Sequence, residues 1–266
     1  MIYVILAHNS PESLKRLILR LSQKKSYFVI HIDKSIDIAP FINITKDIER
    51  CHYTNKRYVT HWGSFALVEA TLQAFEYTRT ILRKRQRIIL LSGADYPIKS
   101  TVFIDKYLES HKDTIFINYE EIPLKRWYNG GILRFPAYSE IKKEINIYGG
   151  SQWFSIPPKA LTILFRFLNY NPSFLEYFRH VSIPDESFFQ TLFLNCGHPY
   201  ILNNLRNHNL HHIKWDYPYL HPRIFTAKYF NQLEKSKSLF SRKFNPKESD
   251  EILSKLDLII KSTEHH

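Results

Sequence analysis

Two adjacent carboxylates at the start of an apolar segment are candidates for acid–base chemistry. Asp185 and Glu186 follow Pro184 and precede a run rich in phenylalanine. One interpretation is structural, with Asp185 as the N-cap of a helix and both acidic groups near its positive end. The other is chemical, because apolar neighbours desolvate a carboxylate and raise its pKa toward the range of a general base. On that interpretation Glu186 is the proton acceptor.

Three basic residues toward the C-terminus are candidates for binding an anion. Arg223, Arg242 and Lys243 lie among aromatic residues, unlike a purely solvated run of charge. The planar fork of arginine matches phosphate oxygens, and lysine adds a compact positive charge. The open alternative is that all three are ordinary surface charges.

Histidine and cysteine spacing favours neither a metal site nor a disulfide framework. A histidine-rich stretch comprises His208, His211, His212 and His221. No matching cysteine pair or H-E-x-x-H pattern accompanies it, so zinc binding is not favoured. Cys51 and Cys196 could form one bridge, but we expect two reduced thiols, which suits a reducing cytoplasm.

Strands and helices alternate in the pattern that would bring such residues together. Strands are predicted over Ile2–Ala7, Tyr27–Ile32, Arg87–Leu91, Thr114–Tyr119 and Pro199–Leu202. Helices are predicted from Pro11, after a Ser10 cap, and over Gly63–Lys84, Thr101–His111, Pro157–Asn169, Glu186–Asn195 and Lys247–Ile260. This alternation predicts an α/β protein with a Rossmann-like, mostly parallel sheet flanked by helices.

Polar residues follow three of the predicted strands directly. In open α/β sheets, ligands bind beyond the carboxyl ends of the strands, so His8, Asp33 and Asp95 should meet at one crevice. This is the geometry of a nucleotide pocket. The chain has neither G-x-G-x-x-G nor a P-loop signature, so a phosphate-bearing ligand would need another holder.

The regular alternation lapses between Glu120 and Gly149. This stretch carries Trp127, Tyr128 and the pair Gly130-Gly131. A long irregular connection inside a compact domain is usually functional. No linker divides the chain, so we expect one domain over residues 1–266.

Composition excludes several classes of protein. Among the 266 residues, 44% are hydrophobic and 15% aromatic, which is typical of a packed globular chain and not of a disordered one. No run approaches the ~18 apolar residues of a membrane span. The net charge of +12 suggests a nucleic-acid-binding module as an alternative of a different class. The basic residues are dispersed and form no stripe, so we expect no nucleic-acid partner.

Seven short blocks, in order, resemble one enzyme family. They are Tyr3–His8, His31–Ser35, Trp62–Ser64, Leu91–Ile98, Gly150–Phe154, Pro184–Thr191 and Leu239–Phe244. The sequence resembles the core-2/I-branching N-acetylglucosaminyltransferases together with the peptide O-xylosyltransferases, the glycosyltransferase family 14 type. The match spans nearly the whole chain.

The resemblance implies a GT-A type fold and inverting transfer of a sugar from a UDP-sugar to a hydroxyl group. It also implies that no divalent metal or other cofactor is needed, and that Glu186 is the general base. The donor-binding residues it implies are His8, Asp33, Asp95, Arg223, Arg242 and Lys243. Residues 1–118 would mainly bind the nucleotide sugar, and residues 119–266 would mainly bind the acceptor and carry the base.

The chemistry of the leaving group agrees with this implication. A departing UDP gains negative charge, which an enzyme must stabilise more in the transition state than in the ground state. Metal-dependent relatives use an Asp-x-Asp motif, but Asp95 has Gly93 before it and Pro97 after it at that spacing. Arginine and lysine side chains could supply the positive charge instead.

The substrates are less defined than the reaction. UDP-N-acetylglucosamine is the first donor to consider, and UDP-xylose competes because Glu-Ser-Phe-Phe resembles the xylosyltransferase branch. We expect a glycan or lipid-linked saccharide as acceptor. Its candidate contacts are Glu121, Trp127, Tyr128 and Trp153, because aromatic faces suit sugar rings. Packing within the protein is the equal alternative for these side chains.

The chain departs from Golgi members of the family, which carry an N-terminal membrane anchor and a cysteine framework. We therefore expect a bacterial-type enzyme that uses cytoplasmic UDP-sugar, for instance in polysaccharide biosynthesis. Peripheral contact with the anionic inner face of a membrane is a further hypothesis. Each basic residue near such a surface is worth ~1 kcal/mol.

Overall fold

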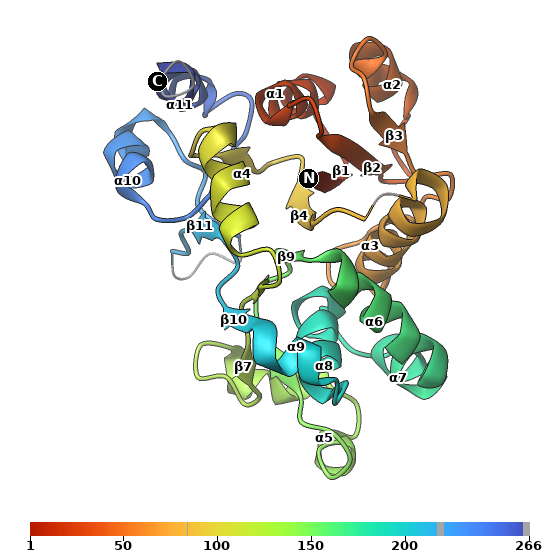
Figure 1. Cartoon of the computed structure of the whole chain (residues 1–266). Helices are drawn as coiled ribbons and strands as arrows, with labels where there is room; N and C mark the ends of the chain where they lie inside the picture. Colours follow the sequence, from red (N-terminus) through yellow and green to blue (C-terminus); the bar gives the residue numbers. More distant parts are fainter. Residues whose placement is uncertain (84, 217–220, 263–266) are drawn as a thin grey trace.

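A central mixed sheet organises the protein. The computed structural model describes residues 1–83, 85–216 and 221–262, and within them a seven-stranded sheet has the order β10-β6-β9-β4-β1-β2-β3 (Figure 1). Its strands are β1 (Ile2–Ala7), β2 (Tyr27–Ile32), β3 (Cys51–Tyr53), β4 (Ile88–Ser92), β6 (Ile115–Ile117), β9 (Phe154–Ile156) and β10 (Leu205–Asn207). Because β9 and β10 follow residue 118, both predicted halves of the chain contribute strands to this sheet.

The sheet is mostly parallel, as predicted. Strand β1 pairs in parallel with β2 and β4, β2 with β3, and β6 with β10. Only β9, among the described strands of this sheet, runs antiparallel, against β4 and β6. Every residue of β1 is buried, as expected of a central strand covered on both faces. The α/β prediction is confirmed.

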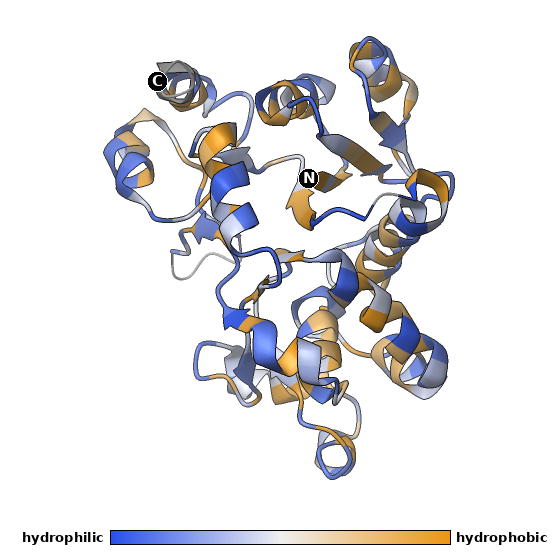
Figure 2. Cartoon of the chain, in the orientation of Figure 1, coloured by the Kyte–Doolittle hydropathy of each residue, from blue (hydrophilic) through white to orange (hydrophobic). Residues whose placement is uncertain are grey.

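Alternate side chains of β1 enter two hydrophobic cores. Ile2, Val4 and Leu6 pack on the face covered by α3 (Ala66–Tyr77), α6 (Pro158–Tyr170), α7 (Pro172–Phe178) and α8 (Phe188–Asn195). Tyr3, Ile5 and Ala7 pack on the opposite face with α1 (Pro11–Leu21), α4 (Thr101–Ser110) and α11 (Asp250–Ser262). This period of two follows from the pleat of a strand. The central strands are correspondingly hydrophobic in Figure 2.

Short elements surround the main sheet. A second sheet joins β11 (His211–Ile213), β12 (Phe240–Arg242) and β5 (Tyr96–Pro97), so the C-terminal part of the chain is paired with the loop after β4. The irregular stretch contains β7 (Glu120–Glu121), a 3-10 segment over Tyr128–Arg134, α5 (Tyr138–Ile141) and β8 (Tyr148–Gly149). The remaining helices are α2 (Ala39–Thr45), α9 (Pro199–Asn204) and α10 (Phe230–Lys235).

Most predicted elements are confirmed, with small differences at their ends. The Ser10 side chain accepts a hydrogen bond from Ser13 N–H and so caps α1. The helix predicted from Gly63 becomes α3, and its expected last residue, Lys84, lies outside the described residues. The helix predicted from Glu186 begins two residues later, at Phe188.

One predicted strand is wrong. Pro199–Leu202 forms the start of helix α9, and strand β10 follows it directly. Proline suits the first position of a helix, and the His198 side chain accepts a hydrogen bond from the Tyr200 N–H at 3.1 Å. This local capping outweighs the β-forming tendency of the apolar residues.

Two further findings concern the whole chain. Among the described helices, none combines the length and apolar character that crossing a bilayer requires. Cys51 and Cys196 are free thiols, which confirms that part of the prediction.

Candidate active site

The loops that follow β1, β2 and β4 lie together at one edge of the sheet. The Asp33 N–H donates to the Ala7 carbonyl at 2.9 Å, and the Gly93 N–H donates to the Leu6 carbonyl at 2.9 Å. His8, Asp33 and the turn containing Asp95 therefore share this edge, as predicted. His8 is exposed there. Loss of part of the water around the imidazole, followed by the nearby charge of Lys243, lowers the pKa of His8.

The carboxylate of Asp33 organises its own loop. Oδ1 accepts hydrogen bonds from Ser35 N–H at 2.8 Å and from the Ser35 hydroxyl at 2.5 Å, and Oδ2 accepts from the N–H and hydroxyl of Thr60. Burial pushes the pKa of Asp33 upward, but these hydrogen bonds outweigh burial and hold the pKa below its usual range. Direct contact of Asp33 with a donor remains a prediction.

Asp95 is an internal counter-ion. Its side chain is fully enclosed, accepts hydrogen bonds from Ser92, and lies 3.4 Å from both His211 Nε2 and Arg242 Nε. Burial raises the pKa of Asp95, but the charge of Arg242 and the contacts with His211 and Ser92 together outweigh burial and lower the pKa overall. Because the side chain is enclosed, the structure favours a role in fixing Arg242 over the predicted contact with the donor.

The charge of Arg242 interacts both with Asp95 and with the turn that carries Asp185 and Glu186. The Arg242 guanidinium lies 4.3 Å from the ring centroid of Trp153. Burial lowers the pKa of Arg242, and attraction to the negative charges of Asp95, Asp185 and Glu186 offsets only part of this effect. Trp153 is 5% exposed and also packs against His211. The prediction of Trp153 as an acceptor contact therefore does not fit the structure, since its faces are already covered.

The two other predicted phosphate-binding residues differ in availability. Lys243 is half-buried at the strand end, where burial and the neighbouring Arg242 charge lower its pKa. Its N–H donates to the Arg223 carbonyl at 3.3 Å, so the backbones of the two residues are adjacent. The Arg223 side chain turns instead to Asp216 and the Tyr229 hydroxyl. An anion would have to compete with Asp216 for it.

The turn that carries Glu186 is fastened to three distant segments. Pro184–Glu186 is a 3-10 turn before α8. The Gly150 N–H donates to the Glu186 carbonyl at 2.7 Å, and the Ile183 N–H donates to the Gly63 carbonyl at 2.9 Å. The Ser182 N–H donates to the Arg134 carbonyl at 2.9 Å. Blocks far apart in sequence therefore meet around this one carboxylate.

The two adjacent carboxylates have different surroundings. Glu186 is 26% exposed on its side chain, and its Oε2 lies 2.7 Å from Arg134 Nη1. Asp185 is 7% exposed, and its buried Oδ1 has no hydrogen-bond partner among the described residues. Burial, followed by the charge of Glu186, raises the pKa of Asp185 to about 7. The predicted N-cap role of Asp185 is wrong, because the residue that directly precedes α8 is Ser187.

Trp127 packs at the centre of the irregular stretch. Its ring lies 3.6 Å from the Arg134 guanidinium. A Cβ added at Gly131 or Gly149 would come within 2.4 or 2.5 Å of that ring, so only glycine fits at either position. Trp127 is thus a packed support for Arg134, and contact of its partly exposed ring with the acceptor remains a prediction.

The outer residues of this segment can reach solvent. Tyr128 is 84% exposed. The exposed Glu121 pairs with Lys142 at 3.4 Å, and Arg126 pairs with the neighbouring Glu120. Tyr128 and Glu121 therefore remain predicted acceptor contacts.

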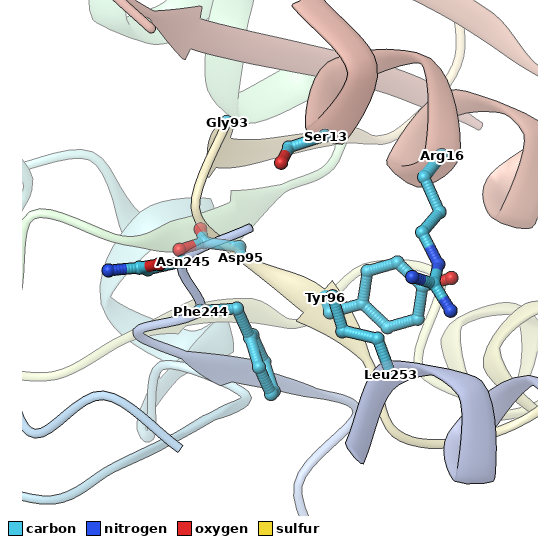
Figure 3. Close-up of a pocket in the computed structure, with 8 residues that line it drawn as sticks. All are labelled: Ser13, Arg16, Gly93, Asp95, Tyr96, Phe244, Asn245 and Leu253. Atoms are coloured by element: carbon cyan, nitrogen blue, oxygen red, sulfur yellow. The ribbon is translucent and has the colours of Figure 1, made fainter. Parts of the chain in front are cut away.

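A small cavity lies behind the Asp95 turn. It has a volume of about 20 Å³ and is lined by Ser13, Arg16, Gly93, Asp95, Tyr96, Phe244, Asn245 and Leu253 (Figure 3). Such a volume holds little more than a water molecule. It is too small for a nucleotide sugar and belongs to the packing between α1, β5 and α11.

Sequence reasoning missed Arg134 and Arg126. Arg134 contacts Glu186 directly, and the charge of Glu186 acts on Arg126. The available signal was their position beside Trp127 and the glycine pair, in the stretch already identified as irregular. Among the described residues, no group of three or more His, Cys, Asp or Glu side chains could hold a metal ion. Metal independence of the reaction remains a prediction.

Comparison with known proteins supplies independent information. A profile of the Core-2/I-Branching enzyme family matches residues 1–235, a range that ends before Arg242 and Lys243. Xylosyltransferase from Ciona intestinalis is 24% identical over 96% of this chain and 33% of its own length. Xylosyltransferase 1 from Rattus norvegicus is 23% identical over 96% of this chain and 35% of its own length. The chain thus spans about a third of these curated relatives.

Among solved structures, a galactosyltransferase, LgtC, in complex with donor and acceptor sugar analogues aligns with a TM-score of 0.46. The alignment has 11% identity and covers 98% of this chain and 96% of that one.

Proposed function

Because the chain belongs to the Core-2/I-Branching enzyme family, we propose that it is a glycosyltransferase that moves a sugar from a UDP-sugar to a hydroxyl group. We propose inverting, metal-independent transfer with Glu186 as the general base. UDP-xylose is the preferred donor, since the relatives described above are named xylosyltransferases. UDP-N-acetylglucosamine is the alternative, and a glycan, lipid-linked saccharide or peptide hydroxyl is the acceptor.

One observation carries the proposal. The positive charge of Arg242 is attracted both to Asp95, at the proposed donor edge, and to Asp185 and Glu186 in the turn that carries the candidate base. This arrangement supports one site that contains both the proposed donor edge and the candidate base. In the reaction, the acceptor oxygen forms a bond to the anomeric carbon while its proton passes to Glu186. The bond from that carbon to the diphosphate breaks, and the electron pair leaves with UDP. Lys243 and Arg242 stabilise the charge that develops there.

Calorimetric titration in EDTA with UDP, UDP-xylose, UDP-N-acetylglucosamine, UDP-galactose and UDP-glucose tests the donor. We expect binding of UDP and of UDP-xylose to survive chelation. If none of these ligands binds either in EDTA or with a divalent cation present, the proposal is wrong. Binding that appears only after a divalent cation is added would remove metal independence alone.

Glu186→Gln tests the base. We expect donor affinity within about twofold of wild type and turnover lower by roughly 10²- to 10⁴-fold, the usual contribution of general-base catalysis. Glu76→Gln is the matched control, because Glu76 pairs with Arg79 at 3.0 Å at the far end of α3. Unchanged turnover in the Glu186→Gln variant would remove Glu186 from this role.

A further inference from the structure

The side chain of Arg134 lies against the proposed base. Its Nη1 is 2.7 Å from Glu186 Oε2, and the two side chains are only 21% and 26% exposed. Partial burial weakens screening by water and salt, so this pair interacts more strongly than an exposed one. The contact uses Oε2, which leaves Oε1 as the oxygen that can take a proton from the acceptor.

Arg134 is held in place by contacts other than Glu186. Its guanidinium stacks on Trp127 at 3.6 Å, and its carbonyl accepts the Ser182 N–H at 2.9 Å. The Trp127 ring is itself confined by Gly131 and Gly149. The cation is therefore placed before any substrate arrives, which is the condition for an effective electrostatic group.

We propose that Arg134 is a positioning residue for Glu186, which keeps this carboxylate ionised and directs Oε1 toward the acceptor hydroxyl. The inference rests on the proposed function. When the acceptor proton reaches Oε1, the negative charge of Glu186 disappears and Arg134 remains as an uncompensated cation. Negative charge grows on the departing UDP in the same step. Arg134 therefore acts before proton transfer, by holding Glu186 in the ionised form and in the orientation that accept the proton.

Other charged groups face Glu186 and bear on its ionisation. They are Asp185 in the same turn, Arg126 from the irregular segment and Arg242 from β12. Asp185 titrates near neutral pH and could mask a change at Glu186. The pH profile is therefore recorded both in wild type and in an Asp185→Asn background.

The test measures UDP release in EDTA between about pH 3.5 and pH 9, a range that extends below the ordinary pKa of a glutamate. The donor is whichever of UDP-xylose and UDP-N-acetylglucosamine wild type consumes. In Arg134→Gln we expect the acidic limb of the kcat/KM profile to move up by roughly one pH unit, the smallest usual effect of a removed opposite charge. At a pH below both limbs, kcat/KM of Arg134→Gln should then be about tenfold lower than that of wild type. We expect Arg134→Lys, which retains the charge, to keep the limb near its wild-type position.

The control is Arg79→Gln, because Arg79 also combines a carboxylate partner, Glu76, with stacking on an aromatic ring, Phe165. It should leave the profile unchanged. A wild-type acidic limb in both Arg134→Gln and Arg134→Lys would overturn the inference, whatever the loss of rate. Full turnover in Glu186→Gln would instead overturn the proposed function, so the two failures are distinguishable. If Arg134→Gln does not fold, Arg134→Met replaces it.

Discussion

Asp185 and Glu186 are neighbours in one 3-10 turn, yet of the two only Glu186 forms a salt bridge and is appreciably exposed. Burial instead raises the pKa of Asp185 to about 7. The physical argument for a desolvated carboxylate in this motif therefore applies to Asp185. Below about pH 7 a proton held there keeps a second negative charge away from Glu186, which limits repulsion between the two groups.

Replacing Asp185 with asparagine should change how stability depends on pH. The folded protein retains a proton on Asp185 between about pH 4 and pH 7 that the unfolded chain releases, so the free energy of unfolding falls as pH rises through this window. The asparagine side chain cannot ionise. The free energy of unfolding of the variant should therefore rise relative to that of wild type by up to about 1.4 kcal/mol per pH unit, until near pH 7. Urea unfolding at pH 5, 6, 7 and 8 measures this difference.

The matched control is Asp47→Asn, which removes an exposed carboxylate. Its difference from wild type should stay constant over the same series. If the difference in free energy of unfolding between Asp185→Asn and wild type is also constant from pH 5 to pH 8, Asp185 is ionised in the folded protein over that whole range.

At the scale of elements, the irregular stretch acts as a support built around Trp127. Gly131 has φ of 80°, which suits glycine, whereas Gly149 is required for space alone, because a Cβ would meet the Trp127 ring at 2.5 Å. Glycine contacts, short β pairing and the hydrogen bond to the Arg134 carbonyl help to fix the shape of the stretch, which in its described residues contains only one short α-helix, α5.

Gly149→Ala should therefore disturb the site through Trp127. We expect the free energy of unfolding to fall by about 1–3 kcal/mol, as for other overpacked positions, and turnover to fall because Arg134 loses its stacking partner. Thermal unfolding and UDP release measure the two effects. The double variant Gly149→Ala with Trp127→Leu relieves the clash, so it should recover stability but not turnover. Recovery of both would mean that the ring has no part in positioning Arg134.

At the scale of the molecule, the net charge of +12 favours contact with anionic surfaces. We expect co-sedimentation with vesicles containing phosphatidylserine at low salt, release at roughly 0.5 M salt where screening is strong, and little binding to phosphatidylcholine alone. Absence of salt-sensitive binding would remove peripheral membrane contact. Oligonucleotide binding with a steep salt dependence, together with no UDP binding, would favour the nucleic-acid alternative.

Local patterns were sufficient for most elements of the sheet and for the helices that cover it. The apolar run Ile2–Ala7 and the Ser10-Pro11 start signal both appear as expected, because strand burial and helix capping depend on adjacent residues. The strand prediction for Pro199–Leu202 was wrong because the same apolar residues suit a strand or a capped helix. The contact with the His198 side chain favours the helix.

The sequence alone determined the α/β class, the shared edge of His8, Asp33 and Asp95, and the choice of Glu186 as candidate base, since these follow from period, strand direction and motif. Only the tertiary structure decided that Asp95 and Trp153 are internal, and that Arg134 pairs with Glu186. Such partnerships join residues tens of positions apart, and burial and charge at one side chain depend on what the folded chain brings to it.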